Sequence, residues 1–132
     1  MPDYTRVNLK EMEDSSGGDA SKVEARFGRT HLDSDHLGVS YFRYPPGIRS
    51  SVGHSHREQE EAYVVVSGSG LVRLDDEIVE LRQWDVVRVA PSVVRAFEAG
   101  PDGLELIAVG GPKPEGGDGV RSDAPWPDAE DA

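Results

Sequence analysis

The 132-residue sequence contains no cysteine, and acidic residues outnumber basic ones by 25 to 14. The absence of cysteine excludes disulfides, thiolate metal ligands and a cysteine nucleophile. The net charge of −11 repels polyanions, so we predict that the protein does not bind nucleic acid. No run of about 18 apolar residues is present, and the N-terminus lacks the apolar core of a signal peptide. We therefore predict no membrane association and expect a cytoplasmic protein.

Short strand-like segments separated by turn signals occupy most of the chain. No stretch carries an apolar stripe of helical period over three turns, whereas closely spaced short strands favour a sandwich or barrel. Asp75-Asp76 is the expected tip of a hairpin, and 67–70 and 100–103 are expected to be turns. The predicted strands are 22–29, 37–44, 61–67, 71–74, 78–81, 86–89, 93–98 and 104–109.

The length fits one domain with polar ends. Residues 1–30 are predicted to be a polar N-terminal segment that holds an edge strand, residues 31–110 a barrel, and residues 111–132 a Pro-, Gly- and Asp-rich tail. Trp126 within this tail is expected to dock on the barrel or on a partner subunit. Open sheet edges favour pairing between protomers, so we expect a homodimer in which the strand 22–29 joins the partner's sheet.

Two histidines and a glutamate form the most informative pattern in the chain. His54 and His56 are one residue apart, so on an extended segment their side chains project from the same face. Glu61 begins the next strand-like run, and strand alternation favours Glu61 over Glu60 for a place beside the histidines. Tyr63 shares the strand face of Glu61. Two imidazoles and one carboxylate are the ligand set of sites for iron, and also accept nickel, manganese or zinc.

This pattern resembles the first motif of the cupin family: a glycine, five residues, His-x-His, three or four residues, Glu, six residues and Gly. His54, His56, Glu61 and Gly68 match, while the opening glycine is displaced by one position to Gly47. The places of the second motif, which are usually Gly, Pro, Gly, His and Asn, hold Trp84, Ala90, Ser92, Arg95 and Ala99. The resemblance covers about residues 37–110. It implies an all-β fold, the cupin-type double-stranded β-helix, which is a jelly-roll barrel.

In metal-binding cupins the two histidines, the glutamate and a histidine of the second motif converge on one divalent ion. Arg95 occupies the place of that fourth ligand here. A guanidinium offers no lone pair to a metal, and its natural partner is a carboxylate held through two hydrogen bonds, for which Glu61 is the nearest candidate. The resemblance therefore places Arg95 inside the barrel beside the other three residues.

Three interpretations of this pocket stay open. In the first, His54, His56 and Glu61 bind one divalent metal ion. In the second, the pocket is metal-free and binds a small anionic molecule through Arg95, with the histidines as hydrogen-bonding partners. In the third, the barrel is a non-catalytic scaffold. An enzyme of this kind would be a metal-dependent oxygenase or isomerase acting on a small polar molecule, and no catalytic residue can be assigned.

Trp84 and two further histidines receive structural interpretations. Trp84 stands where the family has a turn glycine, and we expect it to act as a hydrophobic plug at one end of the barrel. His31 and His36 lie in a polar stretch and are expected at the surface.

Overall fold

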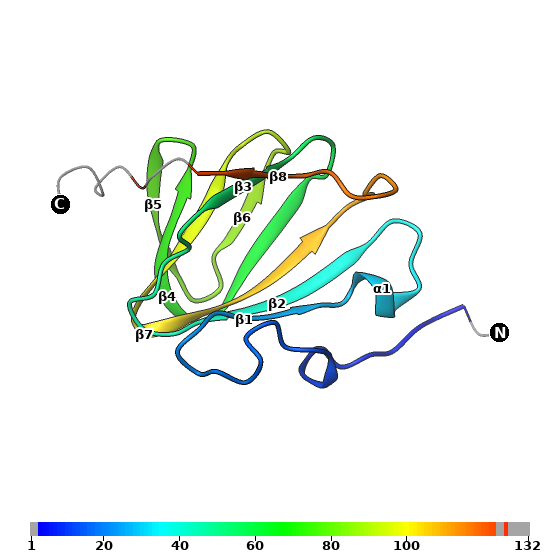
Figure 1. Ribbon diagram of the computed structural model, residues 1–132, viewed down its shortest axis with the longest axis horizontal. Coiled ribbons are helices and arrows are strands. Elements are labelled where there is room, and N and C mark those ends of the chain that lie inside the picture. Colours follow the sequence, from blue (N-terminus) through cyan, green and yellow to red (C-terminus); the bar gives the residue numbers. More distant parts are fainter. Residues whose placement is uncertain (1–2, 124–125, 127–132) are drawn as a thin grey trace.

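The computed structural model describes residues 3–123 and 126, and its regular structure is almost entirely β-strand (Figure 1). Over these residues the helical elements are two short turns, η1 (Leu9–Glu11) and α1 (Arg29–Leu32). No described helix is long and apolar enough to cross a membrane. The strands are β1 (Glu24–Phe27), β2 (Gly38–Tyr44), β3 (Gly53–His56), β4 (Glu61–Leu74), β5 (Glu77–Arg82), β6 (Val86–Val89), β7 (Arg95–Gly110) and β8 (Gly119–Ser122).

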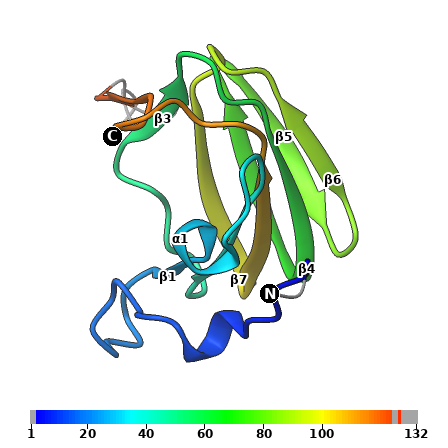
Figure 2. The ribbon, with the colours of Figure 1, turned by 90° about the vertical axis from the view of Figure 1, so that its right-hand side faces the viewer.

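The strands form an antiparallel sheet that curls over on itself, so the predicted all-β class is confirmed. The strand order is β1-β2-β7-β3-β8, and β4 pairs with β5, β6 and β7. The end-on view shows the curl, with β4, β5 and β6 on one side and β1 and β3 on the other (Figure 2). The two longest strands, β4 and β7, pair with each other along their whole length, from Glu61 with Gly110 to Leu74 with Arg95.

Two segments expected to be turns are instead parts of continuous strands. Residues 67–70 lie within β4 and residues 100–103 lie within β7, although the register of this pair shifts between Val65 and Ser67 and between Gly68 and Gly70. A Cβ at Gly68 would collide with the carbonyl oxygen of Gly103, and Gly68 also has a φ of +77°. The glycines therefore let the two strands bend together in close contact.

Most of the other predicted strands are confirmed, with ends that differ by at most two residues. The hairpin at Asp75-Asp76 joins β4 to β5, and the Oδ1 of Asp75 accepts a hydrogen bond from the backbone N–H of Val94 at 2.9 Å. His31 and His36 are exposed as expected. The prediction for Trp84 is wrong: this side chain is 68% exposed and plugs nothing.

The core lies between the two halves of the curled sheet. Along β4, Tyr63 and Val65 face inward because strand side chains alternate. Burial of this apolar surface is the main force that stabilises the shell. The buried cluster consists of Tyr44, Tyr63, Val65, Val72, Leu81, Val89, Phe97, Ala99, Leu104, Leu106 and Ala108.

The segment after residue 110, which the composition predicts to be a tail, returns to the sheet. β8 pairs with β3 over four residue pairs, from Gly53 with Ser122 to His56 with Gly119. Trp126 is 3% exposed and donates a hydrogen bond from Nε1 to the carbonyl oxygen of Ser50 at 2.9 Å. Trp126 therefore docks on the barrel, which is one of the two placements expected for it.

Candidate functional site

The fold brings the predicted pair of histidines and Glu61 together. His54 and His56 lie on β3, and their rings make an edge-to-face contact with centroids 5.3 Å apart. Glu61 is the first residue of β4, after the loop that follows β3. One ligand atom from each of these three side chains lies within 4.8 Å of the other two. The His-x-His spacing thus places both imidazoles on the side of β3 that faces the carboxylate.

Four side chains converge on one carboxylate oxygen, Oε1 of Glu61. The Tyr63 hydroxyl donates a hydrogen bond to it at 2.6 Å. Nε2 of His56 lies 3.1 Å away and Nε2 of His54 lies 3.7 Å away. Burial acts to raise the pKa of Glu61, but the contacts with His54 and Tyr63 and the positive charge of Arg95 outweigh it and hold this pKa at about 2. Glu61 is therefore an anion at neutral pH.

Asp118 fixes the orientation of His56 from the far side of the ring. Its Oδ1 lies 2.9 Å from Nδ1 of His56, and its Oδ2 accepts hydrogen bonds from the backbone N–H groups of Glu58 and Gln59, both at 2.8 Å. Burial acts to raise the pKa of Asp118, but the hydrogen bonds from Glu58, His56 and Gln59 hold it at about 2. An ionised carboxylate can only accept hydrogen bonds, so Nδ1 of His56 must carry the hydrogen.

The opposite nitrogen of His56 faces the centre of the site without a hydrogen-bond partner. Nε2 is buried and has no donor or acceptor in hydrogen-bonding geometry among the residues that the structure describes. With the hydrogen on Nδ1, Nε2 presents a lone pair toward Oε1 of Glu61, only 3.1 Å away. Two electron-rich acceptors at this distance repel each other unless a proton or a metal cation lies between them. A positive charge between Nε2 of His56 and Oε1 of Glu61 would therefore stabilise this arrangement.

Arg95 points into the barrel and is fully buried at 0% exposure. Its Nη2 lies 3.8 Å from Oε1 of Glu61, a single long contact in place of the expected paired hydrogen bonds. The guanidinium instead donates long hydrogen bonds of 3.3–3.4 Å to the backbone carbonyls of His54, Pro91 and Ala90. The residue at the fourth-ligand position thus adds positive charge beside Glu61 and uses most of its donors on the backbone.

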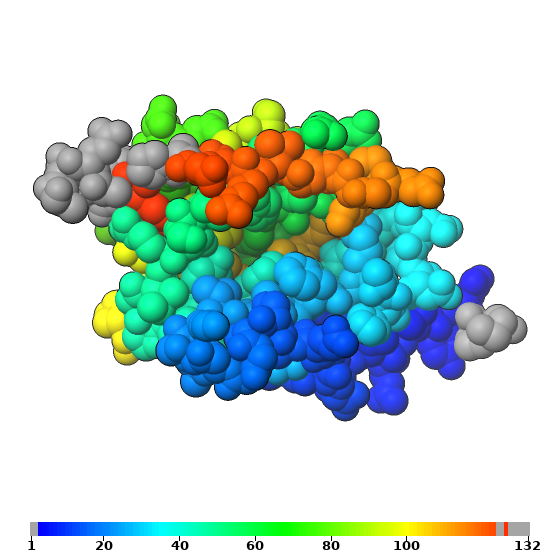
Figure 3. Space-filling model, in the orientation of Figure 1, coloured from blue at the N-terminus to red at the C-terminus, as the bar shows by residue number. Residues whose placement is uncertain are grey.

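A cavity of about 540 Å³ opens in front of this cluster. The space-filling view shows the hollow between the orange C-terminal segment and the blue to cyan segment around β1 and α1 (Figure 3). Its inner wall includes His54, His56, Glu61 and Tyr63, whereas Arg95 lines a smaller cavity of about 40 Å³ that shares His54 and Tyr63 with it. Burial and the neighbouring Glu61 carboxylate raise the pKa of Tyr63, so its hydroxyl keeps its proton.

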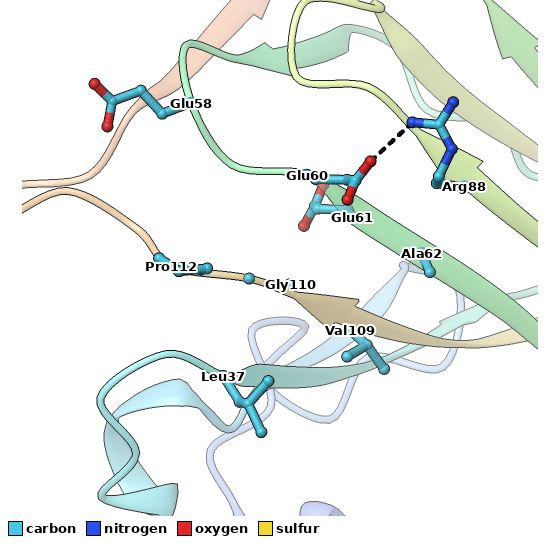
Figure 4. A pocket seen from close by; sticks show the side chains of 10 residues that line it. Leu37, Glu58, Glu60, Glu61, Ala62, Arg88, Val109, Gly110 and Pro112 are labelled. Carbon is cyan, nitrogen blue, oxygen red and sulfur yellow. Dashed lines mark hydrogen bonds and ion pairs between the residues drawn. The ribbon is translucent and has the colours of Figure 1, made fainter.

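Glu60 and Glu61 differ in the side chains that they contact. Glu60 accepts a hydrogen bond from Nη1 of Arg88 at 2.8 Å, and both side chains are exposed (Figure 4). They line a second hollow of about 560 Å³ beside β4 and the end of β7, and Glu61 also reaches its wall. Glu61, and not Glu60, therefore belongs to the histidine cluster, as strand alternation predicts.

Sequence reasoning did not identify Asp118. It lies in a glycine-rich segment more than 50 residues from the His-x-His pair, where nothing in the local pattern distinguishes it from other acidic residues. The one available signal is the interruption of the run Gly116-Gly117-Asp118-Gly119 by a single charged residue. Its contact with His56 depends on the pairing of β8 with β3, which composition did not indicate.

Comparison with known proteins matches the chain to one family and to many structures. The family model described as "Cupin domain" matches residues 40–110. No curated protein matches the chain. A cupin protein from Bacteroides fragilis is 23% identical, with a TM-score of 0.70, over 87% of this chain and 89% of that one.

Two Streptomyces structures are also similar to this chain. A structure of Streptomyces PAC13 with uridine is 17% identical, with a TM-score of 0.72 and 95% of each chain covered. The polyketide cyclase RemF from Streptomyces resistomycificus is 18% identical, with a TM-score of 0.66, over 81% of this chain and 78% of that one. At these identities the likeness concerns the fold.

Proposed function

Because the chain belongs to the cupin family, we propose that its barrel holds one divalent metal ion at His54, His56 and Glu61. The observation that carries this proposal is the state of His56. Asp118 holds its Nδ1–H, and its buried Nε2 faces Oε1 of Glu61 at 3.1 Å with no hydrogen-bond partner among the described residues. A cation bound between these atoms would satisfy both of them, and His54 supplies a third ligand on the same side.

The residues present fit such an ion. Metal–nitrogen and metal–oxygen bonds of about 2.0–2.2 Å place neighbouring ligand atoms around one ion about 3 Å apart. The 3.1 Å between His56 and Glu61 meets this value, and the 3.7 Å between His54 and Glu61 needs only a small rotation of the more exposed His54 ring. Asp118 supplies the outer carboxylate that commonly orients a ligating histidine.

Two imidazoles and one carboxylate suit iron, nickel, manganese or zinc, and leave positions open for water or substrate. A metal ion bound here would act as a Lewis acid or activate oxygen. Around it, Tyr63 keeps a hydrogen-bond donor beside Glu61, and Arg95 supplies a fixed positive charge. We propose a metal-dependent oxygenation or isomerisation of a small polar molecule, or simple binding of such a molecule, as the activity.

The interpretation in which Arg95 itself binds an anionic ligand has less support. Arg95 is fully buried, its two Nη atoms donate to backbone carbonyls, and it does not line the 540 Å³ cavity. A ligand in that cavity would reach the histidines before it reached the guanidinium.

Metal uptake tests the proposed site. The purified chain is stripped with EDTA, incubated in turn with Zn²⁺, Ni²⁺, Mn²⁺ or anaerobic Fe²⁺, desalted and analysed for metal. We expect about one ion per chain for at least one metal, and loss of at least tenfold in affinity in His56→Gln. His31→Gln, which removes an exposed histidine outside the cavity, is the matched control and should bind as the native chain does. Uptake far below one ion per chain for all four metals would refute the proposal.

The homodimer stays a prediction. Among the described strands, β1 stands at the end of the strand order, so one of its edges has no partner strand. We propose that this edge pairs with a second copy. Light scattering during size exclusion should give twice the chain mass of 14.3 kDa, and a monomer would contradict the proposal.

A further inference from the structure

We propose that the 540 Å³ cavity binds a small molecule with an apolar ring body and one anionic group, and that Arg29 and Lys113 recognise the anion. Both residues line the cavity together with the histidine cluster. The inference rests on the proposed function in so far as it takes this cavity as the ligand site. It adds the chemical class of the ligand and two residues that determine specificity.

The charge of the cavity wall is opposite to that of the chain. The protein carries 25 acidic and 14 basic side chains, yet the cavity is lined by Arg29 and Lys113 against the single acid Glu61. Glu61 already accepts a hydrogen bond from Tyr63. A divalent ion at the histidines would increase the positive balance further. Inside a concave wall such a field attracts anions and focuses them, although most of the protein surface repels them.

The backbone on both sides of Arg29 leaves space for its side chain. Its side chain crosses Gly38 of β2 and Gly110 of β7, which are register partners. A Cβ at Gly38 would lie 2.6 Å from Nε and Nη2 of Arg29, and a Cβ at Gly110 would lie 3.1 Å from Nη2. Glycine at both positions therefore leaves room for the guanidinium to lie flat against the strands.

Arg29 retains free donors in this position. Nη2 donates to the carbonyl oxygen of Gly111 at 2.7 Å, which anchors the guanidinium. Gln59 donates to the same oxygen at 3.2 Å and closes that side of the wall. Over residues 3–123 and 126 the bond to Gly111 is the one hydrogen bond of the Arg29 side chain, so its other four N–H groups are available to a carboxylate.

Lys113 faces the cavity from the C-terminal segment. It is exposed, and it has no hydrogen bond or ion pair with any residue that the structure describes. Arg29 belongs to α1, so the two cations come from the two segments that border the hollow in Figure 3. An anion in the cavity would therefore have one cation available on each of these segments.

The apolar part of the cavity wall suits a ligand that contains a ring. Phe27, Phe42 and Tyr44 line the cavity, and the Phe27 and Phe42 rings pack edge to face with centroids 5.7 Å apart. Phe27 is 57% exposed, which leaves a large apolar surface that a ligand ring would cover. Apolar walls with a few placed charges are the usual build of a small-molecule site.

A pair of matched probes tests this inference. Benzoate and benzamide have nearly the same shape and differ in charge, and their dissociation constants can be measured by NMR titration of the EDTA-stripped full chain. We expect benzoate to bind about tenfold more tightly, which is the scale of one hydrogen bond to a charged group. Arg29→Gln and Lys113→Gln should each reduce this preference severalfold, and Arg29→Lys should retain part of it.

Two control variants separate local recognition from overall charge. Arg88→Gln and Lys22→Gln remove the same charges from exposed sites outside this cavity and should keep the preference for benzoate. Equal affinity for both probes, no measurable binding of benzoate, or an equal loss in the control variants would overturn the inference. Metal uptake is measured on the same samples. A retained benzoate preference without metal uptake refutes the metal site alone, whereas uptake without the preference refutes this inference alone.

Discussion

Asp118 Oδ1 and His56 Nδ1 lie 2.9 Å apart and join the C-terminal segment to the centre of the candidate site. The same carboxylate caps two backbone N–H groups of the loop that leads to Glu61. One buried side chain thus sets the ring orientation of one proposed ligand and the approach of another.

Replacing Asp118 should weaken metal binding without touching a ligand. We expect Asp118→Ala to lower metal affinity about 10- to 100-fold, because the His56 ring loses the acceptor that fixes its tautomer. Asp118→Asn keeps one oxygen acceptor and should restore part of the affinity. Competition with a chelating indicator measures both. Asp123→Ala, an exposed acid in the same segment, is the control and should have no effect. Unchanged affinity in Asp118→Ala would show that His56 needs no such orientation.

Arg95 should oppose the metal that the neighbouring residues attract. Two unit charges about 4 Å apart interact by about 4 kcal/mol at an effective dielectric of about 20, and a divalent ion doubles this repulsion. Each 1.4 kcal/mol changes the affinity about tenfold. The repulsion between Arg95 and the ion is therefore measurable even when solvent screens most of it. We expect Arg95→His, which also supplies a ligand at the fourth position, to bind metal at least tenfold more tightly than the native chain. If the variant binds metal and the native chain binds none, the native site is not a metal site.

The free energy of unfolding should fall at acid pH, because protonation of Glu24 weakens contacts that hold the N-terminal segment. Lys10, Arg26 and Arg43 contact this buried carboxylate at 2.6, 2.6 and 3.1 Å. Burial acts to raise the pKa of Glu24, but these partners hold it at about 2, below its ordinary value of 4.5. A lowered folded-state pKa stabilises the fold above the ordinary value, and this stabilisation is lost as pH falls from about 4.5 to about 2.

Urea unfolding from about pH 6 to about pH 2.5 measures this contribution. Glu24→Gln should cost about 2 kcal/mol at the upper end of this range, where three cations lose their contact with a charged carboxylate, and the difference from the native chain should shrink toward the acid end. Glu80→Gln, an exposed acid on β5, should change little at either end. A deficit in Glu24→Gln that stays constant across this range would contradict the account.

Replacing Trp126 should destabilise the fold, whereas replacing Trp84 should not. Trp126 lies over the guanidinium of Arg49 with 4.4 Å from Cζ to the ring centroid, and that of Arg73 lies 5.8 Å from the same centroid. We expect Trp126→Ala to lower the free energy of unfolding by about 3 kcal/mol. Trp84 is exposed and has a φ of +74°, a strained value for a residue with a Cβ. Trp84→Gly should therefore leave stability unchanged or raise it by up to about 1 kcal/mol. Thermal unfolding of both variants gives the comparison, and equal destabilisation would contradict it.

Much of the fold could be predicted from sequence because strand alternation and turn residues are local signals. The strands around Tyr63 and Val72 and the hairpin at Asp75-Asp76 follow from such signals. Gly68 and Gly70 gave a false turn, because the same residues that permit a turn also permit a bulge between two long strands. That distinction depends on β7, more than 20 residues further along the chain.

The candidate site could be predicted in part for the same reason. The His-x-His spacing and Glu61 define a local pattern, and the resemblance placed Arg95 beside them. The contacts of Asp118, Arg29 and Lys113 depend on how distant segments fold over the cavity, and a single sequence does not show this. The expected paired contact between Arg95 and Glu61 is replaced by contacts with backbone carbonyls, which also depend on tertiary packing.

The most direct test of the proposed metal site is to locate the ion itself. Crystals grown from metal-loaded native protein would be measured at the absorption edge of that metal. The account predicts one anomalous peak per chain, about 2.0–2.2 Å from Nε2 of His54, Nε2 of His56 and a carboxylate oxygen of Glu61. No peak, or a peak at the exposed histidines His31 or His36, would contradict it.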